Sequence, residues 1–383
     1  MILVAQWSRL SGGALAIGNS PLWLAYPVAW PAFFCLAGLS FEACAQTAGK
    51  RAAAGGAARD YAIPAAMAVV VAALVLGPAV TTASAARYFG DPDFWLYFAN
   101  LAGWPRFVLP GVFQVNNVVP AVNGTLWSVP ILLLTFLGAI AAAPVRSKSW
   151  IVPAGLMVAA TAVAALLNSA NLSPLATAGF TPAEANGVPL SGAIAGELGI
   201  LLALYRDRIV RDWRLAGVAL AALVAAGLFG DSSWNRSIPF CILAAAASSY
   251  LAAFVATTGR HLPGAAVIDR YSRAFLFYAF PSAQLVLGSG IGAASGTLQA
   301  LVAAAIAGSL SFLTWRIITA IEERGEFAIP GETRPGSGYS LRKLRRQLGM
   351  AIWPGVIALL ALSFVLAVLW MTLVAFQPES GGL

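Results

Sequence analysis

The sequence predicts an all-α integral membrane protein, a polytopic helix bundle with about ten to eleven transmembrane helices. Three observations predict this class: the composition, a series of long apolar segments, and an uneven distribution of basic residues between loops. Of the 383 residues, 60% are hydrophobic and 10% are charged, whereas a soluble globular chain carries about 25% charged residues. So few charges cannot cover a water-facing surface. This composition excludes a soluble enzyme, a disordered protein and a nucleic-acid-binding protein.

The apolar segments have the length of spanning helices, which need roughly 20 mostly apolar residues. They are continuously apolar and do not alternate, which favours helices over the strands of a membrane barrel. The expected spans are 25–45, 62–86, 124–144, 150–167, 187–205, 213–229, 237–257, 274–294, 297–318 and 350–376. Residues 1–17 form a further segment that Ser8 and Arg9 interrupt. We expect it to be the second half of a spanning helix whose first half is absent.

The loops between these spans are alternately rich and poor in Lys and Arg. Of the 23 basic residues, 19 fall in one alternate set of loops. The positive-inside rule places this set in the cytoplasm and predicts a multi-pass protein of the cell inner (cytoplasmic) membrane. The loops 87–122, 168–186, 230–236 and 288–296 then face outside. The net charge of +8 is explained by this orientation, and we expect no nucleic-acid partner.

The composition divides the chain into three parts. Residues 1–325 are predicted to form the main membrane bundle, with its first helix truncated. Residues 326–349 are rich in Gly and Pro and then in basic residues, which is typical of a cytoplasmic linker beside anionic lipid. Residues 350–383 are predicted to add one transmembrane helix and a short external tail. The lipid bilayer is therefore the first expected partner.

The predicted external loop 87–122 is rich in aromatic residues. One interpretation is a surface that receives an external substrate, because aromatic faces suit sugar rings. The other is an aromatic belt lying at the level of the lipid headgroups. The sequence leaves both interpretations open.

No metal site is predicted. The cysteines Cys35, Cys44 and Cys241 lie in apolar segments and show no CxxC spacing. The single histidine, His261, cannot build a multi-histidine site, and it lies in a predicted cytoplasmic loop next to Arg260. These residues indicate buried thiols and a solvated histidine.

Several short motifs occur in a fixed order along the chain. They are Phe33–Leu39 (FFCLAGL), Leu76–Thr82 (LGPAVTT), Leu109–Phe113 (LPGVF), Asn123–Pro130 (NGTLWSVP), Gly196 with Leu204–Arg208 (LYRDR), and Tyr278–Gln284 (YAFPSAQ). Together they resemble the membrane acyltransferase-3 family, which O-acetylates surface polysaccharides and peptidoglycan. The resemblance covers roughly residues 1–325, and Asn123–Pro130 is its most diagnostic segment.

The resemblance implies a reaction that uses both sides of the membrane. An acyl-CoA donor, typically acetyl-CoA, approaches from the cytoplasm, and a hydroxyl of a cell-envelope glycan is acylated outside or within the membrane. The resemblance further implies substrate contacts for Asn123, Trp127, Phe280 and Gln284. It implies no metal.

The catalytic positions of the family are not matched. Arg9 occupies the position expected for the histidine base, or Asn19 does in an alternative register, and Leu132 occupies that of the glutamate. Arginine stays protonated and an amide is not basic, so no catalytic residue is assigned. Intramembrane acids mark functional sites by default. Glu197 is the candidate acid because it lies mid-span between small residues, whereas Glu42 lies near a span end, where its side chain can reach the interface.

Two hypotheses follow for the function. The first is a membrane acyltransferase that transfers an acetyl group from acyl-CoA to a glycan hydroxyl. The alternative is a catalytically inactive relative that acts as a glycan-binding, transport or assembly component. The missing His and Glu favour the alternative, and the surrounding motifs favour the first.

Overall fold

The structure, a computed structural model, describes residues 25–114, 121–142, 155, 158, 182–229, 238–258, 265–289 and 296–323. These residues form helices and no strand, which confirms the all-α class. Three helical stretches are long and apolar enough to cross a membrane: Val28–Val80, Pro239–Thr258 and Leu298–Ala320. Shorter apolar helices occupy Gly124–Ile140, Pro189–Leu204 and Trp213–Ala226. The predictions for residues 1–24, 326–349 and 350–383, and those for Arg9, Asn19 and His261, lie outside the described residues.

The first described stretch is helical almost without interruption. It comprises α2 (Ala25–Ala57), the π-helical turn η3 (Ala58–Ala62), α3 (Ile63–Val71), the π-helical turn η4 (Ala72–Leu76) and α4 (Gly77–Val80). Residues 46–61, which separate two predicted spans, are helical except at Gly49, where φ is +86°. The reason is composition, because this segment is rich in Ala, the strongest helix former. The left-handed conformation at Gly49 costs little because glycine has no Cβ.

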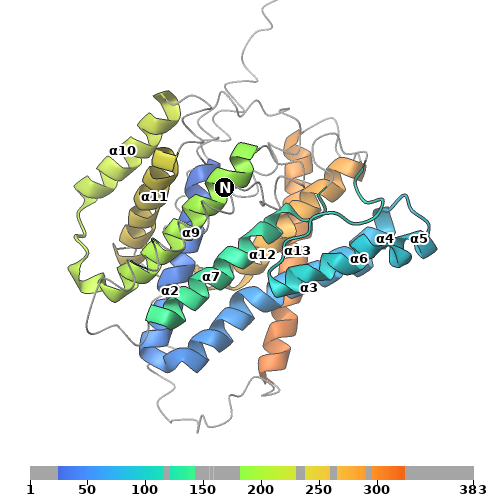
Figure 1. Cartoon of the computed structure of the whole chain (residues 1–383), viewed down its shortest axis with the longest axis horizontal. Helices are drawn as coiled ribbons and strands as arrows, with labels where there is room; N and C mark the ends of the chain where they lie inside the picture. The colour runs from blue at the N-terminus through green and yellow to red at the C-terminus, as the bar shows by residue number, and fades with distance from the viewer. Residues whose placement is uncertain are drawn as a thin grey trace, which may run out of the picture.

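Three helices form the centre of the bundle: α2, α7 (Ser128–Ala142) and α9 (Pro182–Leu204). Figure 1 shows them running in the same direction. The contact between α2 and α9 depends on glycines. A Cβ on Gly38 would collide with the carbonyl oxygen of Gly196, and one on Gly199 would collide with that of Cys35. Small residues at such a contact let helix backbones approach closely in a membrane.

Other helices lie on both sides of this centre (Figure 1). On one side are α10 (Trp213–Phe229) and α11 (Ile238–Thr258), and on the other are α12 (Ala265–Ser289) and α13 (Gly296–Glu323). Large apolar side chains on the outer helices are exposed, among them Trp213, Val218, Leu301 and Leu313. In a helix bundle such side chains face lipid, so their exposure is consistent with a membrane protein.

Three short helices follow α4 and form a lobe beside the bundle (Figure 1). They are α5 (Ala85–Gly90), α6 (Pro92–Leu96) and the 3-10 helix η5 (Tyr97–Ala102). Asn100 stabilises the chain after η5, because its amide donates to the carbonyl oxygens of Tyr97 and Arg106 at 2.6 and 2.8 Å. Tyr97 is buried, whereas Trp95 and Trp104 are exposed. The aromatic residues of this loop therefore serve partly as its own core.

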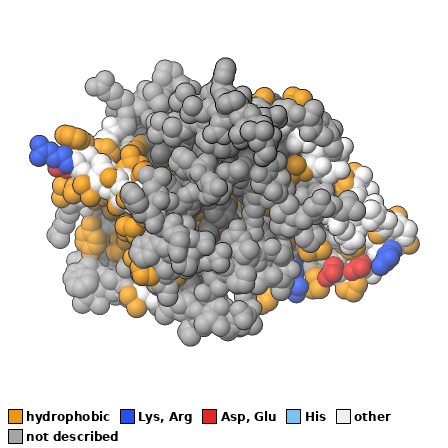
Figure 2. Space-filling view, turned by 90° about the horizontal axis from the view of Figure 1, so that it is seen from above, with side chains coloured by type: hydrophobic (Ala, Val, Ile, Leu, Met, Phe, Trp, Pro, Cys, Tyr) orange, Lys and Arg blue, Asp and Glu red, His pale blue; other side chains and the backbone are white. Residues whose placement is uncertain are grey.

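Exposed charged side chains lie at the edges of the face shown in Figure 2. Figure 2 shows hydrophobic side chains on both flanks of the face in view, with Lys, Arg, Asp and Glu gathered at opposite outer edges. Lys50 and Arg51 are exposed near the end of α2, and Arg211 and Arg214 lie at the start of α10. Charge at the ends of apolar helices is the distribution that a bilayer requires.

Candidate functional site

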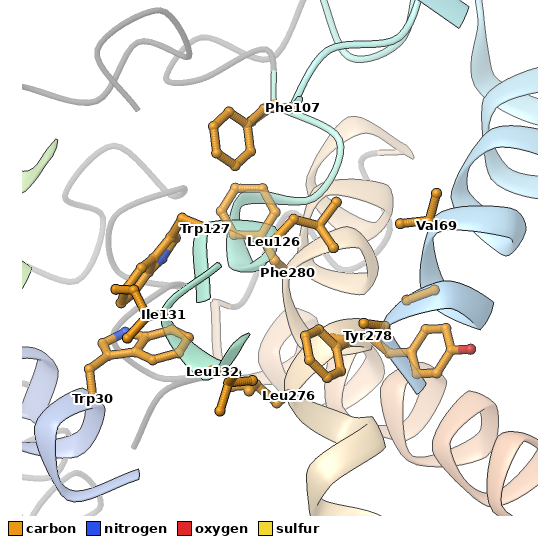
Figure 3. Close-up of a cluster of buried hydrophobic side chains, with 14 of the residues drawn as sticks. Trp30, Val69, Phe107, Leu126, Trp127, Ile131, Leu132, Leu276, Tyr278 and Phe280 are labelled. Atoms are coloured by element: carbon orange, nitrogen blue, oxygen red, sulfur yellow. The ribbon is translucent and has the colours of Figure 1, made fainter. Parts of the chain in front are cut away.

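The predicted substrate residue Trp127 ends the 3-10 helix η6 (Gly124–Trp127), directly before α7. Its ring centroid lies 4.5 Å from that of Trp30 and 5.7 Å from that of Phe34, both on α2. Aromatic pairs at such distances contribute about 0.5–1.5 kcal/mol beyond area burial. Only 4% of Trp127 is exposed. The start of α7 is therefore fixed to α2 by an aromatic cluster, part of which Figure 3 shows.

The side chain of Asn123 binds a backbone carbonyl of α12 that Pro281 leaves without a helical donor. Proline has no N–H, so the carbonyl of the residue four positions earlier loses its helical donor. That residue is Phe277, and Asn123 Nδ2 donates to its carbonyl oxygen at 2.8 Å. Asn123 Oδ1 in turn accepts from the backbone N–H and the hydroxyl of Thr125. Asn123 is fully buried, so its described contacts are all within the protein.

Gln284 and Phe280 lie on the same helix, next to Pro281. Gln284 Nε2 donates to the carbonyl oxygen of Ala121 at 2.9 Å, just before η6. Phe280 is 3% exposed and belongs to the buried cluster that Figure 3 draws. The structure thus brings Asn123, Trp127, Phe280 and Gln284 together where η6 meets α2 and α12. It buries all four, and both amides bind backbone carbonyls.

A second proline is compensated in the same way. In the π-helical turn η4, Gly77 N–H donates to the carbonyl five residues earlier, at Ala72. The next carbonyl, of Ala73, would receive the N–H of residue 78, which is Pro78. The hydroxyl of Tyr88 donates to Ala73 O instead, at 2.8 Å. Burial raises the pKa of Tyr88 to about 12, so this phenol stays a neutral donor at physiological pH.

Glu197 lies on α9 directly after the contact between Gly196 and α2. It is 5% exposed, and its carboxylate packs against Gly138 of α7, where a Cβ would lie 2.5 Å from Oε1. A glycine at that position makes room for the carboxylate. Gly138 lies ten residues beyond Ser128 along α7, or roughly 15 Å. The candidate acid and the four predicted substrate residues therefore occupy different parts of the bundle.

Two further predicted positions can be placed. Leu132, where the resemblance expects a glutamate, is 5% exposed and belongs to the same hydrophobic cluster as Ile131 and Leu276 (Figure 3). Glu42 is fully buried, and its Oε1 accepts from Gln46 Nε2 at 2.9 Å. The expectation that Glu42 reaches the interface from its span end is therefore wrong.

One charged cluster joins η3 to α12 and was not predicted. Asp60 forms ion pairs with both Arg59 and Arg273. The guanidinium of Arg273 also lies 5.6 Å from the centroid of the Tyr61 ring, within cation–π range. The only available signal was that Asp60 is the single acid between two predicted spans. Arg59 is thus held in an ion pair, whereas Lys50 and Arg51 are exposed.

A cavity of about 250 Å³ opens where the end of α4 approaches the C-terminal end of α12. Its lining residues are Val80, Thr82, Gly111, Phe113, Gln114, Leu285, Gly288 and Ser289. The sequence motifs include four of them, Val80, Thr82, Gly111 and Phe113, but nothing in the residue types singled them out as a site. The described part of the chain holds no group of three or more His, Cys, Asp or Glu residues placed to bind a metal ion.

No protein-family model, no curated protein and no solved structure matches this chain.

Proposed function

We propose that this chain is a membrane acyltransferase-like protein of the cell inner (cytoplasmic) membrane. It transfers an acyl group, nominally acetyl, from acyl-CoA to a hydroxyl of a cell-envelope glycan. The observation that carries the proposal is the packing of three motif segments into one cluster. The segment at Asn123–Trp127 contacts Phe34 in the motif of α2 and Phe277 just before the motif of α12. Segments that are far apart in sequence, and whose motifs together resemble one family, are thus in contact.

The reaction defines what the chain must supply. The hydroxyl oxygen of the glycan attacks the thioester carbonyl carbon of acyl-CoA, a C–O bond forms, and the C–S bond breaks. The hydroxyl proton passes to a base, and CoA leaves as a thiol after taking up a proton. A positioned base contributes about 10²–10⁴-fold to such a step. Glu197 is the proposed proton acceptor, because it is a buried carboxylate beside small residues of α7 and α9. A base must lie within hydrogen-bond reach of the proton it takes, so the proposal places the reacting hydroxyl beside Gly138, away from Asn123 and Gln284.

A specific observation favours a second candidate, a catalytically inactive relative that binds or assembles a glycan. Leu132 fills the expected glutamate position with an apolar side chain inside a hydrophobic cluster. The amides of Asn123 and Gln284 bind backbone carbonyls. These features support an architectural role for the motifs in place of a catalytic one.

One experiment separates the two candidates. The purified full chain, in detergent, is given acetyl-CoA with and without a neutral envelope oligosaccharide, and free CoA is measured by a thiol assay. The acyltransferase candidate predicts CoA release that requires the oligosaccharide. The inactive candidate predicts oligosaccharide binding in a parallel titration and no CoA release above the rate without protein.

A further inference from the structure

The cavity between α4 and α12 has a rigid wall. Thr81 Oγ1 donates to the carbonyl oxygen of Pro110 at 2.7 Å, and the Thr82 backbone N–H donates to that of Gly111 at 3.1 Å. Gly111 has φ +71°, and a Cβ there would lie 2.6 Å from Thr81 Oγ1. Only glycine fits this position without displacing the neighbouring segment Thr81–Ala83. The segment 110–114 is thus attached to the end of α4 by direct hydrogen bonds.

Phe113 adds a second indication that this wall is specialised. Its φ is +54°, a left-handed conformation that is uncommon for a bulky residue. Such backbone strain costs about 1–3 kcal/mol and clusters at ligand-binding and active sites. The strained backbone places Phe113 in the cavity lining, next to Gln114. Phe113 is 5% exposed and belongs to the hydrophobic core, whereas the amide of Gln114 is exposed.

The chemistry of the lining limits the ligand. Among the described residues, those that line the cavity carry no charge, so an anionic or cationic ligand would find no ion partner and would lose hydration. Thr82, Gln114 and Ser289 supply hydroxyl and amide groups, while Val80 and Leu285 supply apolar surface. Mostly apolar walls with a few polar groups are typical of small-molecule sites, which usually measure about 300–1,000 Å³. The 250 Å³ here suits one small ring.

We infer that this cavity binds an uncharged, hydroxyl-bearing ring the size of one monosaccharide unit. The inference rests on the proposed function only in identifying that ring as part of the acceptor glycan. The cavity lies at the end of the bundle that the distribution of basic residues predicts to face outside. Phe113 forms part of the apolar wall against the sugar, and Gln114 hydrogen-bonds its hydroxyls.

The test uses the full chain in detergent and three probes: D-glucose, N-acetyl-D-glucosamine and glucose 6-phosphate. Binding is measured by saturation-transfer difference NMR titration. We expect both neutral sugars to bind, and glucose 6-phosphate to bind at least about tenfold more weakly. Equal or tighter binding of glucose 6-phosphate would overturn the inference, as would the absence of binding by both neutral sugars.

Two variants locate the site. Leu285→Trp places a larger side chain in the cavity and is expected to weaken neutral-sugar binding at least about tenfold. Its matched control is Leu301→Trp on the exposed face of α13, which should leave binding unchanged. Gln114→Leu removes an exposed amide without disturbing buried packing, and it should weaken binding about two- to tenfold. Circular dichroism confirms that each variant is folded.

The outcomes separate this inference from the proposed function. Unchanged sugar binding in both Leu285→Trp and Gln114→Leu contradicts the cavity site, even if the chain transfers acetyl groups. Loss of sugar binding in these variants, together with no CoA release by the unaltered chain, supports the cavity site and contradicts acyl transfer.

Discussion

Asn123 illustrates how the role of one residue depends on a distant one. The resemblance assigns it to substrate contact, whereas its amide donates to the carbonyl that Pro281 leaves without a helical donor. The sequence did indicate the carbonyl, since a proline inside a predicted helical span leaves the carbonyl four residues earlier without a backbone donor. What the sequence did not reveal was the partner, because the contact joins residues 154 positions apart.

We predict that Asn123→Leu lowers the free energy of unfolding by about 1–3 kcal/mol, the cost of a buried carbonyl left without its donor. In a Pro281→Ala background the restored N–H can serve Phe277, so the same substitution should cost less. Chemical unfolding of the four proteins in this double-mutant cycle measures the difference. If Asn123→Leu lowers the free energy of unfolding equally in both backgrounds and also abolishes sugar binding, the prediction is wrong and Asn123 contacts substrate.

At Glu197 we predict a catalytic effect without a structural one. Glu197→Gln keeps the shape of the side chain but removes the carboxylate that accepts a proton, so acetyl transfer should fall about 10²–10⁴-fold. Glu42→Gln is the matched control, because Glu42 is also a buried acid but is not assigned a role in transfer. Unaltered transfer by Glu197→Gln, at normal expression, would leave Glu197 as a purely structural residue.

At the scale of elements, the sequence predicted helices better than their ends. The predicted spans 213–229 and 237–257 agree with α10 and α11 to within one residue. In contrast, α12 begins at Ala265, nine residues before the predicted span 274–294. The charges of Arg270 and Arg273 lower the local hydropathy, so these residues were left out of the predicted span. They do not prevent helix formation, and both lie in α12. Hydropathy locates membrane-embedded residues, whereas helices continue into water.

The glycine contact between α2 and α9 gives an element-scale prediction. Gly38→Ala places a Cβ against the backbone carbonyl of Gly196, so the helices must separate and the free energy of unfolding should fall by about 1–3 kcal/mol. Gly217→Ala on α10 is the control, because no atom lies within 4 Å of the place that its new Cβ would take. That substitution should stabilise the helix by up to about 1 kcal/mol. Thermal unfolding that ranks the two variants in the opposite order would contradict the packing of α2 on α9.

At the scale of the whole molecule, the orientation in the membrane is the prediction to test. Cys35, Cys44 and Cys241 are first replaced by alanine. Single cysteines at Asp91 and Ser173 should then react with a membrane-impermeant thiol reagent added to intact cells. Single cysteines at Ser147 and Gly336 should be protected, because the positive-inside rule predicts that the basic loops lie in the cytoplasm. Labelling of the Ser147 position from outside would reverse the topology.

The composition was sufficient to predict the class of the molecule, because so few charges cannot surround a water-soluble core. It was not sufficient to predict the cavity. That site arises where Thr82, Phe113 and Ser289 meet, three ordinary residues whose proximity depends on tertiary packing. The candidate acid Glu197 was predicted from its place in an apolar span, whereas its neighbour Gly138 could be found only from the structure.

The most direct test of the proposed function follows the acyl group itself. Acetyl-CoA carrying an isotopically labelled acetyl group is incubated with the purified full chain and a neutral envelope oligosaccharide, and the oligosaccharide is analysed by mass spectrometry. The acyltransferase proposal predicts labelled acetyl esters on the oligosaccharide, fewer in Glu197→Gln and in Leu285→Trp. An oligosaccharide that binds the chain but carries no labelled acetyl group would contradict acyl transfer and establish the inactive relative.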